Sequence, residues 1–321
     1  MLITALVVNI IIYISTKIFK MRLLTIGIGR KGAEISSLLY KKGVKVNRIP
    51  LFRCYAILSD VSDIARIRLD EKNKFYIPGS LDVTGVINEI LNRYEINEGA
   101  ILITNLNRFD VEITTKVGEK LKDVFEDPIM VLGVVRSIED SGEFRRMVRS
   151  LKKVSNVLML VREDKIVESI EALNVIARVG EIDLRRRVAG EVVIDTSDFF
   201  NSVLCEGFTV LGYAVRKLPL FRFFPKRSYL LAIRTKRMLD MVKEAIGNLS
   251  FEGDVESAKS SLIVFAGNPN EITMDGLFSC INFIESLNRD MVIRYGDYPI
   301  PNARFLSSVV LFSGLRRFKF D

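Results

Sequence analysis

The sequence of 321 residues contains no histidine, no tryptophan and only three cysteines. The absence of histidine excludes an imidazole as a general base or as a metal ligand. Cys54, Cys205 and Cys280 are far apart in the chain and show no paired metal-ligand spacing, and an uneven number of cysteines does not suit a disulfide framework. We therefore expect a chain from a reducing, cytoplasmic environment, with no metal site of its own.

Basic residues outnumber acidic ones, with 47 Lys and Arg against 39 Asp and Glu, a net charge of +8 and a pI near 9.3. This excess favours anionic partners, such as nucleotide, nucleic acid, an anionic membrane or an acidic protein. The basic runs at 145–149 and 185–187 have no interleaved aromatic residues for stacking on bases. We interpret them as solvated helix faces, which leaves nucleic-acid binding as a minor alternative.

Residues 2–18 are mostly apolar and are followed by Lys20 and Arg22. The apolar run is near the shortest length that spans a membrane, and positive charges after it would hold the rest of the chain in the cytoplasm. One interpretation is therefore a membrane contact through residues 2–18. The other is that translation begins at Met21, so that residues 1–20 are a misplaced start or an extra packed helix.

From Met21, short apolar runs alternate with amphipathic stretches, a pattern typical of a mostly parallel sheet flanked by helices. In the first half we expect strands at 23–28, 54–58, 101–104, 129–135 and 157–161, with helices between them. In the second half we expect helices at 199–206, 237–246 and 272–287, and strands at 229–235, 261–266, 290–295 and 307–312. The predicted organisation is an apolar segment at 1–20, a nucleotide-type α/β domain at 21–165, a central helix and linker at 166–190, and a smaller α+β domain at 191–321.

The second half contains the stretches that resemble a known family. Residues 253–259 lead into an apolar strand at 262–267 and then into the turn Gly-Asn-Pro-Asn-Glu-Ile-Thr at 267–273. This succession, with the segment 205–212 before it, is similar to the second half of FtsZ, and we identify the chain as a divergent, archaeal-type FtsZ-like member of the FtsZ/tubulin superfamily. The resemblance implies an FtsZ/tubulin-like α/β fold, in which a Rossmann-like parallel-sheet nucleotide domain is joined by a long central helix to a smaller α+β domain.

The segment from Gly27 to Gly32 has the spacing G-x-G-x-x-G, directly after a predicted strand and before a helix. Glycines there allow a tight turn, and the amino end of the following helix favours a phosphate. The resemblance assigns GTP or GDP, with Mg²⁺ accompanying the nucleotide, to this turn. The residues predicted to contact the nucleotide here are Gly27, Gly29, Arg30, Lys31 and Gly32. A glycine turn that only packs the helix on the strand remains the alternative.

Two acidic residues are further candidates for the nucleotide site. Asp60 follows the second predicted strand, and the segment 57–60 that ends in it resembles the Asn-Thr-Asp turn of FtsZ. The same acid would hold a ribose in a Rossmann-type oxidoreductase that binds nicotinamide or flavin, which is an alternative function. Glu171, in the central helix, matches the position from which the family reads the base, although an exposed helix carboxylate explains it equally well.

The loop after the strand at 101–104 departs most from the family. FtsZ and tubulin have a glycine-rich loop there, whereas this chain has Asn-Leu-Asn-Arg-Phe-Asp-Val-Glu at 105–112. Its side chains obstruct the approach of backbone N–H groups to a phosphate, and Asp110 and Glu112 repel one. Arg108 offers a guanidinium group that offsets part of the loss. We expect Asp110 to cap the following helix and Phe109 to anchor it.

Residues 193–199, Val-Ile-Asp-Thr-Ser-Asp-Phe, resemble the acidic loop that one FtsZ subunit inserts into the nucleotide site of its neighbour. Asp195 and Asp198 match both acids of that loop, whereas Val193 replaces its asparagine. The resemblance implies that the two carboxylates are catalytic and orient the attacking water. Ordinary capping of the following helix is the alternative.

Together these features predict a guanine-nucleotide-binding cytoskeletal protein, of the kind active in cell division, that forms or joins filaments with weak or absent GTP hydrolysis. GTPase activity then requires an assembly that completes the site. The expected partner is a second copy of the chain or another FtsZ/tubulin-like protein. The first alternative is a pseudo-GTPase that caps or regulates filaments of another family member, and the second is the oxidoreductase.

Overall fold

A computed structural model describes residues 22–46, 49–78, 83–93, 97–179, 196–218 and 227–318. The predicted membrane contact through residues 2–18 lies outside these residues, as does Asp195, and of Asp198 the backbone alone is described. Among the residues described, no helix has the length and apolar character needed to cross a membrane.

In the described parts of the chain, ten strands form one continuous sheet in the order β11-β10-β12-β9-β8-β7-β6-β1-β4-β5. The strands of the first half are parallel to their neighbours: β1 (Leu23–Ile28), β4 (Phe52–Leu58), β5 (Lys74–Tyr76), β6 (Gly99–Asn105), β7 (Ile129–Val135) and β8 (Val157–Arg162). The second half is mixed, with β12 antiparallel to both neighbours: β9 (Phe208–Lys217), β10 (Ser260–Gly267), β11 (Val292–Pro299) and β12 (Phe305–Leu315). Two short strands, β2 (Lys45–Val46) and β3 (Ile49–Pro50), form a separate hairpin.

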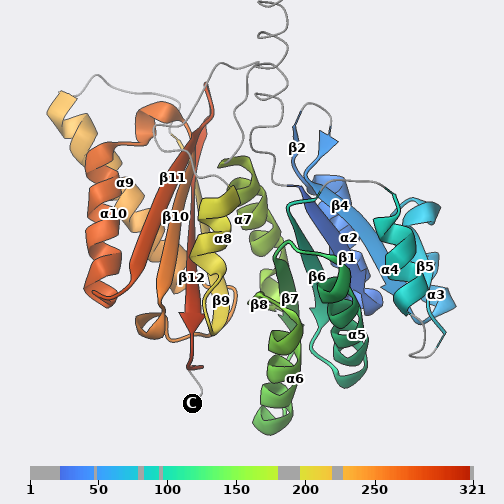
Figure 1. Cartoon of the computed structure of the whole chain (residues 1–321). Coiled ribbons are helices and arrows are strands. Elements are labelled where there is room, and N and C mark those ends of the chain that lie inside the picture. The colour runs from blue at the N-terminus through green and yellow to red at the C-terminus, as the bar shows by residue number, and fades with distance from the viewer. Residues whose placement is uncertain are drawn as a thin grey trace, which may run out of the picture.

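The two halves of the sheet meet between β8 and β9, where Met159 pairs with Thr209 in parallel register. The central helix α7 (Ile166–Val179) begins just after β8 and packs against β9, β10, β11 and β12. The structure therefore has the expected α/β architecture of a parallel-sheet domain, a connecting helix and a smaller mixed domain (Figure 1). The domain boundaries at 20, 165 and 190 stay a prediction.

Helices cover both faces of the sheet, because alternate residues of each strand point to opposite sides. In β1, Leu24, Ile26 and Ile28 join one buried cluster, and Leu23 joins the other. The first cluster lies under α4 (Val83–Leu91), α5 (Arg108–Val124), α6 (Ser141–Val154), α9 (Arg227–Gly247) and α10 (Met274–Leu287). The second lies under α2 (Gly29–Lys42), α7 and α8 (Thr196–Val203). Short helical turns complete the chain: α3 (Val61–Ile64), η1 (Glu71–Asn73), η2 (Glu163–Lys165), η3 (Val255–Ser257) and η4 (Pro269–Glu271).

One predicted element of the second half is wrong. Residues 229–235 were expected to form a strand, but they belong to the long helix α9. Tyr229 and Leu231 are 61% and 39% exposed on this helix, so the apolar residues do not mark a single buried face. The strand of this region is β9 instead, which the sequence pattern did not predict.

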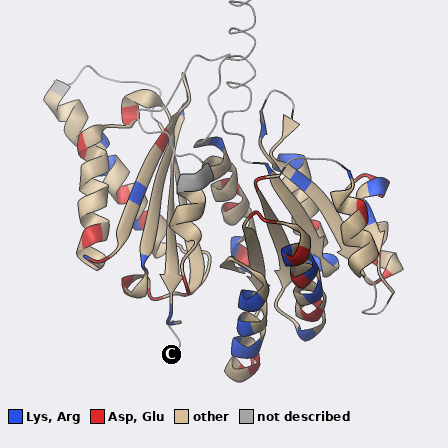
Figure 2. Ribbon diagram, viewed as in Figure 1, with Lys and Arg blue, Asp and Glu red and all other residues tan. Residues whose placement is uncertain are grey.

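Basic residues recur along α6 (Figure 2), and they are exposed. The exposed members are Arg145, Arg146, Arg149, Lys152 and Lys153. The opposite face of the helix buries Phe144, Val148, Leu151 and Val154 against the sheet. This arrangement agrees with the interpretation of the 145–149 run as a solvated helix face.

An aromatic cluster joins the two halves near the end of β12. The ring of Phe318 stacks on Phe208 with centroids 4.5 Å apart, and it meets Phe144 edge-on at 5.3 Å. Phe251 is a further neighbour at 6.0 Å. Because Phe144 belongs to α6 of the first half and the other three rings belong to the second, this cluster holds the halves together.

Candidate functional site

The turn from β1 to α2 contains the three glycines of the predicted phosphate motif. Gly29 has a φ of +69°, a conformation that favours glycine over residues with a side chain. A Cβ at Gly27 would overlap the backbone of Gly32, and a Cβ at Gly32 would overlap the carbonyl of Ile103 in β6. Gly27 and Gly32 are therefore required by the packing of α2 on β1 and β6, whether or not a phosphate binds.

The carboxylate of Asp110 lies directly against Gly29. A Cβ at Gly29 would overlap this carboxylate, and Asp110 is only 9% exposed. Asn107 Nδ2 donates a hydrogen bond of 2.7 Å to Asp110 Oδ2. Burial nevertheless raises the pKa of Asp110, because the loss of solvation outweighs this hydrogen bond. The Asp110 carboxylate fills the space beside Gly29, so a phosphate would bind there only after this side chain moves.

The expected roles of Asp110 and Phe109 in helix α5 are wrong. The cap of α5 is Asn107, whose Oδ1 accepts a hydrogen bond of 2.9 Å from the backbone N–H of Asp110. Phe109 is 43% exposed and does not anchor the helix. Asparagine is a preferred capping residue, so its position three residues before Asp110 was the signal that the sequence offered.

The two basic residues of the turn are paired with carboxylates of the same chain. Lys31 Nζ lies 2.7 Å from Glu163 Oε1 and 3.3 Å from Glu34 Oε2. The hydrogen bond between Lys31 and Glu163 raises the pKa of Lys31 and lowers that of Glu163. Arg30 Nε lies 3.2 Å from Glu34 and 3.8 Å from Asp63. Both cations lie beside the predicted site, but they contribute to neutralising acids of the chain.

The remaining predicted contacts are more dispersed. Arg108 is 88% exposed and lies 4.0 Å from Glu143. Asp60 caps α3 by accepting a hydrogen bond of 2.8 Å from the N–H of Ser62, and this backbone hydrogen bond lowers its pKa. Glu171 acts on Tyr213 of β9, whose pKa is raised first by burial and then by the charge of Glu171. The roles of these three residues in nucleotide binding stay predictions.

Of the two predicted catalytic acids, Asp198 is the third residue of α8, and Asp195 lies outside the described residues. Asp198 precedes Phe200 by two residues, and Phe200 packs against Gly99 at the first position of β6. Gly32 packs against Ile103, near the opposite end of the same strand. Four residues of a strand span about 13 Å. The start of α8 and the β1–α2 turn are therefore at opposite ends of the parallel sheet.

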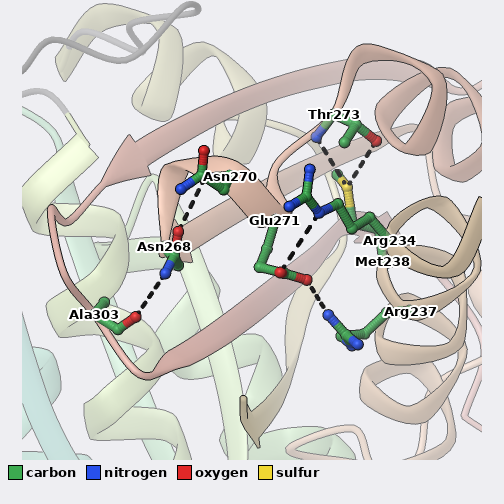
Figure 3. Close-up of polar contacts among 8 residues, drawn as sticks. All are labelled: Arg234, Arg237, Met238, Asn268, Asn270, Glu271, Thr273 and Ala303. Atoms are coloured by element: carbon green, nitrogen blue, oxygen red, sulfur yellow. Dashed lines mark hydrogen bonds and ion pairs between the residues drawn. The ribbon is translucent and has the colours of Figure 1, made fainter. Parts of the chain in front are cut away.

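The turn at 267–273 carried much of the resemblance, and the structure shows how it is held. Glu271 is 3% exposed and receives two arginines of α9, with Arg237 pairing with its Oε2 and Arg234 Nε 3.6 Å from its Oε1. Figure 3 shows both guanidinium groups pointing at this carboxylate. The pairs fix the turn before α10 to the neighbouring helix.

Side chains on either side of Glu271 complete the same turn. Asn268 accepts a hydrogen bond of 3.0 Å from the N–H of Asn270 and donates one of 2.9 Å to the carbonyl of Ala303 (Figure 3). Thr273 caps α10, and its N–H lies 3.4 Å from the sulfur of Met238. This segment is thus a structural element of the second half. Within the described ranges, no group of three or more acidic or cysteine side chains is placed to hold a metal ion.

Solved structures of CetZ and FtsZ proteins resemble this chain. GDP-bound monomeric CetZ1 from Haloferax volcanii has a TM-score of 0.75 at 19% identity, covering 93% of this chain and 96% of that one. The GTPγS-bound protofilament of CetZ2 from the same organism has a TM-score of 0.70 at 20% identity, covering 93% and 95%. An FtsZ dimer from M. jannaschii has a TM-score of 0.68 at 13% identity, covering 98% and 96%. These likenesses show that the chain has an FtsZ/tubulin-like fold.

In sequence, the chain is similar to CetZ proteins. Residues 163–319 match the family model described as the C-terminal domain of tubulin-like CetZ. CetZ1 of Haloferax volcanii is 27% identical over 62% of this chain, an alignment that spans 58% of CetZ1. CetZ3 of the same organism is 24% identical over 92% of this chain and 88% of CetZ3.

Proposed function

We propose that this chain is a guanine-nucleotide-binding cytoskeletal protein that forms or joins filaments by head-to-tail contacts, with weak or absent GTP hydrolysis. Asp195 and Asp198 of one subunit would face the β1–α2 turn of the next. The nucleotide would be GTP or GDP, and Mg²⁺ would enter with it. The cytoplasm and the process of cell division are the expected setting.

The observation that carries this proposal is the position of the two predicted half-sites. Phe200 and Gly32 pack at opposite ends of β6, so the first turn of α8, which contains Asp198, is far from the β1–α2 turn of the same chain. Two patches at opposite ends of a molecule meet only when copies stack head to tail, and such contacts generate filaments when the rotation does not close a ring. The protofilament described for CetZ2 and the protofilaments of TubZ from Bacillus thuringiensis are assemblies of this superfamily.

The contacts of the turn support weak nucleotide binding, and a chain that binds little GTP hydrolyses little of it. Asp110 fills the space beside Gly29, and Lys31 and Arg30 are paired with acids. A site that must first move these groups binds a phosphate at a cost. The same contacts favour a second candidate function, a pseudo-GTPase that binds through its acidic loop to the exposed turn of another FtsZ/tubulin-like protein and caps its filament.

Sedimentation of the purified chain tests the first candidate. We expect the protein to pellet with GTP in a concentration-dependent manner, and we expect nucleotide analysis of the purified protein to find guanine nucleotide. Replacing both acids, Asp195→Asn with Asp198→Asn, should remove pelleting. The matched control is Asp275→Asn, which changes an exposed carboxylate in the first turn of α10 and should pellet normally.

Isothermal titration with GTP separates the two candidates. Micromolar binding by the wild-type chain would exclude the pseudo-GTPase. No binding, together with co-sedimentation on filaments of another family member, would exclude a filament that the chain forms alone. A chain that stays monomeric under all these conditions, with and without such a partner, would contradict both.

The N-terminal segment bears on where such a filament would lie. If residues 2–18 contact a membrane, the full chain should float with vesicles of anionic lipid, and a chain beginning at Met21 should not. Flotation of neither protein would contradict the membrane contact and would leave the filament proposal unaffected.

A further inference from the structure

We propose that Asp110 is a built-in competitor of phosphate, an internal carboxylate that closes the β1–α2 turn and so limits nucleotide binding by this chain. This inference rests on the proposed function, because it concerns the same turn. It goes further by assigning the weak binding to one side chain, 81 positions along the chain from the glycine that it covers.

The first support is steric. Gly29 adopts a left-handed conformation with a φ of +69°, and both oxygens and the carbon of the Asp110 carboxylate approach the point where its Cβ would be. No room for even a methyl group remains on this side of the turn. A phosphate bound by the backbone N–H groups of the turn would need the same space.

The second support is electrostatic. The amino end of a helix favours an anion, and at α2 that place is taken by an anion of the protein. A phosphate brought beside the Asp110 carboxylate would meet a like charge in a poorly solvated place, where repulsion is stronger than in water. Both the space and the charge of Asp110 therefore oppose a phosphate.

The third support is the cost of burying the Asp110 carboxylate. Asn107 caps α5 through its Oδ1, so the helix begins without help from the Asp110 side chain. Burial raises the pKa of Asp110, which means that the charged carboxylate is less stable here than in water. A buried titratable group with a shifted pKa at a predicted site is a candidate for a functional task.

The position of Asp110 is held by one contact that can be broken. Asn107 Nδ2 donates to Asp110 Oδ2 at 2.7 Å, and Asp110 is the third residue of α5. A change of its side-chain rotamer would open the turn without unfolding the helix. Nucleotide binding then carries the cost of this rotation, which lowers the affinity of the wild-type chain.

Two substitutions separate the charge of Asp110 from its size. Asp110→Asn keeps the size and the contact with Asn107 but removes the charge, and Asp110→Ser removes both. In titration calorimetry with GTP and with GDP, each in the presence of Mg²⁺, we expect Asp110→Ser to bind at least about ten-fold more tightly than wild type. Asp110→Asn should fall between the two.

The control is Glu119→Gln, nine residues further along α5. Glu119 is exposed, so its substitution removes a negative charge from the same helix without opening the turn. It should bind like wild type. Circular dichroism and thermal melting of each variant confirm that it is folded before titration.

The inference is overturned if folded Asp110→Ser binds GTP and GDP no more tightly than wild type, whether both bind or neither does. It is also overturned if Glu119→Gln gains as much affinity as Asp110→Ser, because a general effect of charge would then explain the result. Failure of the proposed function is recognised separately, since sedimentation and the Asp195 and Asp198 variants test assembly without reference to Asp110.

Discussion

Lys31 Nζ lies 2.7 Å from Glu163 Oε1, and this ion pair ties the first turn of α2 to the junction of β8 and α7. Glu163 also lies 3.8 Å from Arg136. The Glu163 carboxylate is therefore paired with two cations, Lys31 and Arg136, beside the predicted nucleotide site. The side chains of Lys31 and Glu163 are 33% and 37% exposed, so solvent screens the pair.

The first prediction concerns this carboxylate. Glu163→Gln should change the free energy of unfolding by less than about 1 kcal/mol, as is usual for exposed ion pairs. It should nevertheless tighten GTP binding, because Arg136 and Lys31 each lose one paired carboxylate, although Lys31 keeps Glu34. Calorimetric titration measures the second effect. Glu244→Gln is the matched control, since it breaks the 2.8 Å pair with Arg216 at similar exposure in the second half. Equal affinity of Glu163→Gln and wild type would contradict the prediction.

The second prediction concerns the buried carboxylate of the 267–273 turn. Glu271→Gln leaves Arg234 and Arg237 without their counter-charge in a place where Glu271 is 3% exposed. Removing one partner of a buried ion pair typically costs about 3–5 kcal/mol. Urea denaturation should therefore show a large loss of stability, whereas Glu285→Gln, on the exposed side of α10, should change it by less than about 0.5 kcal/mol. A similar small change in both variants would show that the turn does not depend on these pairs.

The third prediction concerns the aromatic cluster between the halves. Phe318→Ala removes a ring that stacks on Phe208 and touches Phe144, and such a truncation in a core costs about 3 kcal/mol or more. We expect a lower melting temperature and faster proteolysis. Phe278→Ala, which removes a ring that is 52% exposed on α10, serves as the control and should melt like wild type. A melting temperature unchanged in Phe318→Ala would argue against a role for the cluster in joining the halves.

The fourth prediction uses the raised pKa of Asp110. A carboxyl group whose pKa is higher in the folded chain than in the unfolded chain destabilises the fold when it is ionised, and this cost disappears as the pH falls through the folded-state pKa. Asp110→Asn should therefore raise the melting temperature at about pH 8 and raise it less at about pH 4. A gain of equal size at both values would mean that the charge of Asp110 is not the cause.

Much of the first half could be predicted from local sequence. The strands at 23–28 and 129–135 were predicted with their observed bounds, because parallel strands buried on both faces are continuous apolar runs. The second half was harder. Residues 229–235 look like a strand because apolar residues dominate them, yet they form part of α9, where several of those side chains stay exposed.

The candidate site was predictable in its location but not in its contacts. The spacing of Gly27, Gly29 and Gly32 indicates a turn between a strand and a helix, which the structure confirms. That Asp110 would lie on Gly29, and that Glu163 would pair with Lys31, depends on which loops the parallel sheet brings to one edge. Such contacts join residues far apart in the chain, and local pattern carries no signal for them.

The packing of Gly27 and Gly32 has a consequence for comparing relatives of this chain. Each would clash with backbone if it gained a side chain, so a lineage that abandoned nucleotide altogether would still retain both. The presence of these two glycines in a sequence therefore indicates close packing of the helix on the sheet, and it does not indicate nucleotide binding. Surveys that use these two glycines to count nucleotide-binding proteins would then overestimate the number of such proteins. The residue at the position of Asp110, which lies against Gly29, would be more informative.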